Sequence, residues 1–99
     1  MNLYITKSKR KNKKYDLLDN NKKYLLSFGH SQYQDYTMHK DPQRQANYLS
    51  RHGKEDHSAK NVISAAFMSR WLLWGKPSLT ASIRDVNKRF NINIKLIQT

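Results

Sequence analysis

Four histidines and the acids near them are the side chains in this sequence whose types could support metal or acid–base chemistry. Three of the histidines lie in the segment 39–57, HKDPQRQANYLSRHGKEDH, together with three acids. These residue types could suit a metal-dependent nuclease, but no two of the histidines have the i, i+4 spacing of a helical His-Glu-x-x-His zinc site. We expect His39 to bond near Asp41 instead, and His52 to lie in a last helical turn, where the helix dipole favours a cation. The sequence therefore predicts no metal, no cofactor and no catalytic residue.

The composition points to binding of negative charge. The 99 residues include 19 Lys and Arg against seven Asp and Glu, for a net charge of +12. This imbalance attracts nucleic acid, acidic protein surfaces or anionic lipid. The absence of cysteine excludes disulfides and thiolate sites. No apolar run approaches the roughly 18 residues of a membrane span, so we expect a soluble protein with no membrane span, no signal peptide and no small-molecule substrate.

Six of the eight residues from 7 to 14 are basic, which is the densest charge in the chain. Such a block resists compaction and is typical of a flexible arm or an exposed loop. We therefore divide the chain into a basic N-terminal segment, 1–14, and one domain, 15–99. The predicted binding residues for a polyanion or an acidic partner are Lys7, Lys9, Arg10, Lys11, Lys13, Lys14, Arg44, Arg51, Arg70, Arg84, Lys88 and Arg89.

Short alternating segments predict the strands that must position these residues. Residues 2–6 and 92–96 alternate apolar and polar side chains, and each is expected to form a strand. Between them, residues 14–29 read as a β-hairpin with a two-residue turn at Asn20-Asn21. That turn pairs Leu17 with Tyr24 and Tyr15 with Leu26. It places the side chains of Tyr15, Leu17, Tyr24, Leu26 and Phe28 on one face.

Three helices are predicted from their end signals. Asp41 and Pro42 suit the start of a helix that ends at Gly53. A second helix is expected from a cap at Ser58 to Gly75, and a third from a cap at Ser78 to about residue 90. Residues 29–40 have no clean period and are treated as a connection. The prediction is a small α+β domain in which the hairpin and the terminal strands pack against two or three helices.

The second predicted helix carries Trp71 and Trp74, which could be core residues or a platform for bases. The helix is apolar nearly all round, so we expect both rings to belong to the core. Arg70 interrupts this apolar segment. It could extend to water, pair with Asp85 or face an anionic ligand.

Several motifs resemble a family of short basic proteins encoded by large eukaryotic DNA viruses. Members typically carry a Tyr-rich hairpin, a Phe-Gly pair, an Asp-Tyr/Phe-Thr-x-His-Lys-Asp segment, an Arg-His pair, Ser-Arg-Trp-Leu-Leu-Trp-x-Lys-Pro and a terminal Arg-Phe. The chain differs where SAAFM replaces a more usual Ala-Gly-Phe-Trp, and where the expected Trp after Glu55 is missing. The matching residues are Phe28-Gly29, Asp35 to Asp41, Arg51-His52, Ser69 to Pro77 and Arg89-Phe90.

This resemblance implies a virion component, such as a minor capsid or core-associated protein, found in the virion and in the host cytoplasm or viral factory. Our leading hypothesis is a non-enzymatic structural protein that uses its basic surface to contact acidic capsid or core partners. The alternative is a protein that binds DNA or RNA without sequence specificity, using the same cations on phosphates.

Overall fold

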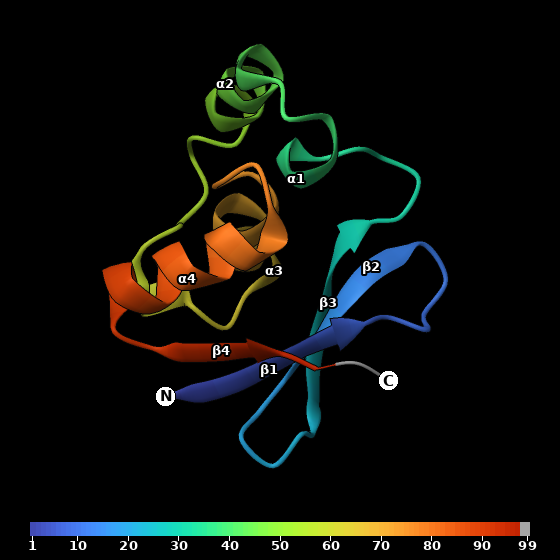
Figure 1. Ribbon diagram of the computed structural model, residues 1–99, viewed down its shortest axis with the longest axis vertical. Coiled ribbons are helices and arrows are strands. Elements are labelled where there is room, and N and C mark those ends of the chain that lie inside the picture. Colours follow the sequence, from blue (N-terminus) through green and yellow to red (C-terminus); the bar gives the residue numbers. More distant parts are fainter. Residues whose placement is uncertain (98–99) are drawn as a thin grey trace.

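The computed structural model describes residues 1–97, in which the helices gather on one face of a four-stranded sheet (Figure 1). The strands lie in the order β3-β2-β1-β4. β1 pairs antiparallel with β2 and parallel with β4, and β2 pairs antiparallel with β3. The strands are β1 (Asn2–Lys7), β2 (Lys13–Leu18), β3 (Tyr24–His30) and β4 (Asn93–Leu96). The predicted α+β class and both predicted terminal strands are confirmed.

Alternation along the strands creates the face that the helices cover. Leu3 and Ile5 of β1, Leu17 of β2, Phe28 of β3 and Ile94 of β4 are all buried there. The helical segments contribute the other half of the core, with Phe67, Met68, Leu72 and Val86 fully buried. Burying apolar side chains between the two layers is the main stabilising term of such a domain.

The helical segments begin at the residues whose side chains cap them. Asp41 accepts hydrogen bonds from the N–H groups of Gln43 and Arg44, and Ser78 accepts one from Ala81, as the sequence predicted. The helical elements are α1 (Tyr36–His39), α2 (Pro42–Arg51), a 3-10 turn η1 (Ala59–Asn61), α3 (Ala65–Met68), a π-helical turn η2 (Ser69–Leu73) and α4 (Leu79–Phe90).

The second predicted helix is shorter than expected. Ser58 does cap a helical turn, but only the turn η1. The longer helix starts at Ser64, whose hydroxyl donates to the Asn61 carbonyl and accepts from the Phe67 N–H. The π turn that follows changes the helical phase, so Leu72 and Leu73 point into the core. α1 was not predicted at all. It forms because the Asp35 carboxylate caps it.

The predicted turn at Asn20-Asn21 is wrong. A wider loop joins β2 to β3, and the Asp19 carboxylate organises it by accepting from the N–H groups of Asn21 and Lys23, at 2.8 and 2.9 Å. Lys22 adopts the left-handed conformation that closes the loop, with φ 64°.

The wider loop moves the hairpin register by two residues, so Tyr15 lies opposite Phe28 and Leu17 opposite Leu26. A shift of two residues keeps the same side chains inside. An irregularity after Leu17 then reverses Tyr24, which is 45% exposed on the outer face. The prediction that Tyr24 faces the helices is therefore wrong.

Residues 1–14 do not form a separate arm. Residues 2–7 belong to β1, and Lys13 and Lys14 begin β2, because β1 has pairing partners on both sides. Only residues 8–12 form the exposed loop that we offered as the alternative. This loop is closed by a bond from the Ser8 N–H to the Lys14 carbonyl, at 3.0 Å.

The indole rings of Trp71 and Trp74 are half-buried and pack against the edge of the core. Phe67 and Phe90 contact the Trp71 ring. The prediction that this segment forms the interior is confirmed for its leucines, while the two indoles lie at the boundary. Within residues 1–97, no helix is long and apolar enough to cross a bilayer.

Candidate anion-binding cleft

The side-chain carboxylates bond to neighbouring groups of the same chain, and few of them pair with a Lys or Arg side chain. Each of the seven carboxylates accepts a hydrogen bond or an ion pair from a neighbouring group. Of the 19 Lys and Arg, only Lys14 and Arg89 pair with a carboxylate among residues 1–97. The positive charge therefore has few internal partners and is available to an external anion.

A cleft of about 560 Å³ collects part of this charge. It opens between the helix α2, the π turn η2 and the end of the β2–β3 hairpin where β2 begins and β3 finishes. Its titratable lining residues are Lys13, Lys14, His30, Asp35, Arg44, Arg51 and His52, and its ring-bearing walls include Tyr33, Tyr48 and Trp74. The combination of cations with aromatic walls suits a ligand that carries both negative charge and flat apolar surface.

The helix α2 presents two arginines to the cleft. Arg44 and Arg51 are seven residues apart, which is close to two full turns, so they lie on the same side of the helix. Arg44 donates to the Gln34 side chain at 3.1 Å. Arg51 is exposed and has no carboxylate partner in the described part of the chain. Both guanidinium groups are thus available to a bound anion.

Three stacked rings support the wall of the cleft. Tyr48 packs against Trp74 with 4.4 Å between ring centroids and only 2° between planes. On its other side, Tyr48 stacks on His52 at 4.2 Å. Gln45 fixes the same wall, because its amide donates to the main-chain carbonyls of Trp74 and Gly75. Burial raises the pKa of Tyr48 to about 12, with the nearby Glu55 carboxylate adding to the effect.

One buried ion pair forms the opposite side of the cleft. The Lys14 ammonium lies 2.5 Å from the Asp35 carboxylate, whose side chain is only 3% exposed. Asp35 also accepts from the Thr37 N–H at 2.9 Å. Gly29 lets the main chain of β3 pack closely against the side chains of Leu73 and Lys14. It has φ 78°, and a Cβ there would lie 2.8 Å from a Leu73 methyl group.

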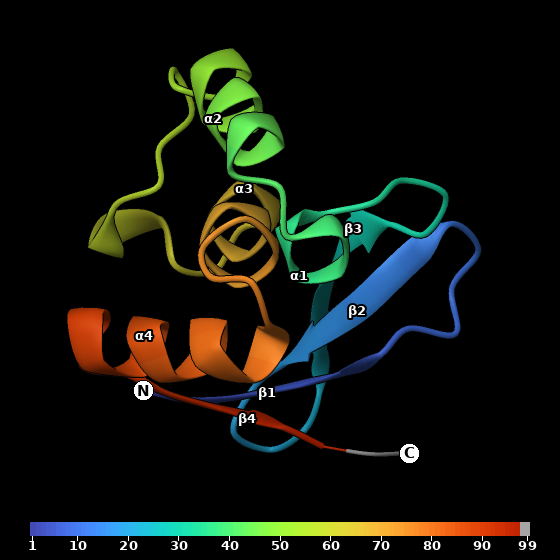
Figure 2. The same ribbon diagram turned by 45° about the horizontal axis from the view of Figure 1, so that its top comes forward.

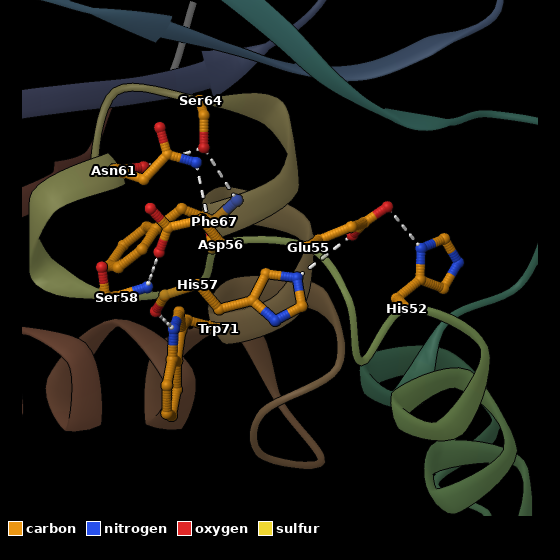
Figure 3. Close-up of polar contacts among 9 residues, drawn as sticks. All are labelled: His52, Glu55, Asp56, His57, Ser58, Asn61, Ser64, Phe67 and Trp71. Carbon is orange, nitrogen blue, oxygen red and sulfur yellow. Dashed lines mark hydrogen bonds and ion pairs between the residues drawn. The ribbon is translucent and has the colours of Figure 1, made fainter.

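A hydrogen-bonded loop after α2 holds the helix in place (Figure 3). Glu55 bridges His52 and His57, at 2.8 and 3.1 Å, and the bond to His52 is the main reason that the pKa of Glu55 is lowered. The Trp71 indole N–H donates to the His57 carbonyl at 2.8 Å. The C-terminal end of α2, which carries Arg51, is thereby attached to the core.

The predicted basic residues other than Arg70 separate into three places. Lys13, Lys14, Arg44 and Arg51 meet in the cleft. The β1–β2 loop lies beside it, because the Ser31 N–H donates to the Asn12 carbonyl at 3.1 Å. This loop and the end of β1 carry Lys7, Lys9, Arg10 and Lys11. The third set, on α4, comprises Arg84, Lys88 and Arg89, and none of these three lines the cleft.

Arg70 lies apart from the cleft and stacks over the Trp71 ring at 4.0 Å. It makes no ion pair with Asp85, which instead accepts from Arg89 at 3.4 Å. Burial lowers the pKa of the half-buried Arg70 guanidinium. Arg89 lies 4.9 Å from the centre of the same indole, so two guanidinium groups meet at one ring.

Two features of the cleft were not predicted from the sequence. Tyr48 was not among the predicted binding residues, although its position between Arg44 and Arg51 in sequence was a usable signal. His30 was considered only as a metal ligand, and His52 only as a metal ligand or as a cation at a helix end. Within residues 1–97, no group of three or more potential ligands could hold a metal ion. His39 instead accepts from the Asp41 N–H at 3.0 Å, as expected.

Comparison with known proteins assigns the chain to a family but not to a function. Neither a curated protein nor a solved structure matches the sequence. A family described as a family of unknown function, DUF5754, matches residues 3–52. This region holds nearly all of β1, the strands β2 and β3, the helices α1 and α2, and every Lys and Arg that lines the cleft. Since the match covers half of the chain, the protein belongs to the DUF5754 family of unknown function.

Proposed function

We propose that this protein is a non-enzymatic nucleic-acid-binding module that contacts phosphates through its cleft and the adjacent β1–β2 loop, without sequence specificity. The observation that supports this proposal is the distribution of charge. All seven side-chain carboxylates accept bonds from neighbouring groups, while the cleft brings together Lys13, Arg44 and Arg51, none of which pairs with a carboxylate among residues 1–97. Phosphate contacts of this kind supply affinity without reading sequence.

The spacing of the cations supports a chain of phosphates as the ligand. Arg44 and Arg51 are separated by about 10 Å of helix, given a rise of about 1.5 Å per residue. That separation spans more than one phosphate of a nucleic-acid strand. The loop cations extend the positive surface beyond the cleft. A ligand with several regularly spaced charges would therefore use this surface more fully than a single anion.

A salt titration tests this proposal. Affinity for a fluorescent DNA should fall linearly on a log–log plot against salt concentration, with a slope of several units. The double variant Arg44→Gln/Arg51→Gln should bind more weakly and reduce that slope by about one to two units. The matched control is Arg84→Gln/Lys88→Gln, which removes the same charge from α4 and should leave most of the affinity. Equal losses from the two double variants, or no binding at low salt, would contradict the proposal.

A second candidate is the structural role in a virion that the resemblance implies, with acidic capsid or core proteins as partners. The observation that favours it is the indole of Trp71, where Arg70 and Arg89 meet outside the cleft. The half-buried Arg70 guanidinium makes no side-chain hydrogen bond within residues 1–97, so it suits a carboxylate, which accepts two parallel bonds from a guanidinium.

The structural role takes the protein to be encoded by a virus, and purified virions of that virus would separate the two candidates. Retention of the protein on capsid shells emptied of DNA supports the structural role, and release with the genome supports nucleic-acid binding. Under the structural role, Arg70→Gln should weaken retention while Arg44→Gln/Arg51→Gln leaves it unchanged.

A further inference from the structure

The outer face of the sheet lacks a helical cover. In Figure 2, the helices lie above the sheet, and the opposite side carries no element among residues 1–97. The side chains on this side alternate with the buried ones, so Tyr4 and Leu18 face outward beside the buried Leu3 and Leu17. Large rings on an open sheet face need either solvent or a partner.

The strand register places these side chains in one row across all four strands. Tyr24 lies opposite Leu18, Leu18 opposite Tyr4, and Tyr4 opposite Lys95. Neighbouring strands are about 4.8 Å apart, so the two tyrosines are roughly 10 Å apart with a leucine between them. The row therefore offers two rings, one apolar contact and one cation side by side.

A cation accompanies each of the two rings. The Arg10 guanidinium lies over the Tyr24 ring, 3.9 Å from its centroid, and the Lys22 ammonium lies 5.3 Å from the centre of Tyr4. These two basic residues come from the loops at opposite ends of the sheet. Positive charge is thus directed onto the rings from both sides of the row.

The Tyr24 ring is also held in place. Its hydroxyl bonds the Ser27 hydroxyl at 3.0 Å, and Ser27 in turn donates to the Asp16 carboxylate at 2.6 Å. Asp16 is the carboxylate that this face carries within the strands, and the bond from Ser27 engages it. A ring with a fixed orientation loses little freedom when a flat group stacks on it.

We propose that the outer face of the sheet stacks the unpaired bases of a single-stranded nucleic acid, on Tyr4 and on the Tyr24–Arg10 pair. This inference rests on the proposed function and assigns its preferred ligand. A base stacks on a tyrosine ring or on the flat guanidinium of Arg10, while Lys22 and Lys95 meet the adjacent phosphates. In a duplex the base faces are covered by their neighbours, so only the phosphates remain to be bound.

The test compares three labelled probes by fluorescence anisotropy: a short oligothymidylate, an abasic strand of the same length, and a duplex of the same length. The unmodified protein should bind oligothymidylate at least about 5-fold more tightly than the abasic strand, because both carry the same phosphates but only one has bases. Tyr24→Leu should remove most of this preference and leave abasic binding unchanged. Tyr24→Phe keeps the ring and serves as the matched control, which should retain the preference.

The outcomes separate the two proposals. Equal binding of oligothymidylate and the abasic strand by the unmodified protein overturns the stacking inference and leaves the proposed function standing. Absence of binding to all three probes overturns the proposed function, and the inference with it. The comparison on the unmodified protein needs no substitution. If Tyr24→Leu does not fold, as judged by circular dichroism, Tyr4→Leu tests the other ring in the same way.

Discussion

Replacing Lys14 with methionine tests the buried ion pair that forms one side of the cleft. The Lys14 ammonium lies 2.5 Å from Asp35, and the two side chains are 12% and 3% exposed. Methionine keeps most of the side-chain volume but removes the charge, so the Asp35 carboxylate would remain buried without its cation. Losing one partner of a buried pair costs about 3 to 5 kcal/mol.

The expected loss lies at the lower end of this range, about 3 kcal/mol, because Asp35 keeps the hydrogen bonds from the Thr37 N–H and hydroxyl. A domain of this size is stable by about 5 to 15 kcal/mol, so Lys14→Met should still fold. Urea unfolding followed by tryptophan fluorescence measures the loss. With a denaturant dependence of about 1 to 3 kcal/mol/M, the midpoint should fall by about 1 M or more.

Two further variants make the result specific. Lys13→Met removes the same charge from the exposed neighbouring position and should change the stability by less than about 0.5 kcal/mol. The double variant Lys14→Met/Asp35→Asn should be more stable than Lys14→Met alone, since a neutral amide costs less to bury than an unpaired carboxylate. A loss below about 1 kcal/mol for Lys14→Met would refute the reasoning that this pair is buried and coupled.

Three other predictions concern packing and titration. Gly29→Ala should destabilise the fold by about 2 kcal/mol in urea unfolding, because the residue has φ 78° and the new Cβ would meet Leu73 at 2.8 Å. The pKa of Glu55 is lowered, chiefly by its bond to His52, so its contribution to stability should be present above about pH 4.5 and lost as the pH falls further. Thermal unfolding should show this acid-side loss in the parent protein and less of it in Glu55→Gln. The pKa of Tyr48 is raised from 10.0 to about 12, so its stabilising contribution should be lost as the pH rises from 10 to 12. Absorbance titration should show a tyrosine that ionises near pH 12, and Tyr48→Phe should remove it.

Local signals allowed much of the fold to be predicted. Asp41 and Ser78 cap their helices through bonds that span only two or three residues, so the sequence pattern contains the whole interaction. The terminal strands could be predicted because the alternation of apolar and polar side chains lies within each short segment. The turn after β2 was not, because the Asp19 carboxylate favours a loop wider than the two asparagines suggested.

The cleft could not be predicted because residues distant in the sequence form it. Lys14 and Arg51 line one cavity only in the folded chain, and the Gln45 bonds that attach α2 to Trp74 and Gly75 cross about thirty residues. Both cations were among the binding residues predicted from charge, but the sequence could not show that they share a cavity. The tyrosine row on the outer face of the sheet could not be predicted either, because the irregularity near Leu17 turns the Tyr24 side chain from the inner face to the outer face.

The parallel pairing of β1 with β4 joins segments from opposite ends of the sequence, and the Asn93 side chain donates to that of Asn2 at 3.1 Å. During synthesis, the hairpin strands can form as soon as they leave the ribosome, whereas one edge of β1 stays unpaired until residues 93–96 arrive. Throughout that interval the nascent chain presents a free strand edge that another copy could occupy, and its repelling positive charges are then the main protection against such mispairing.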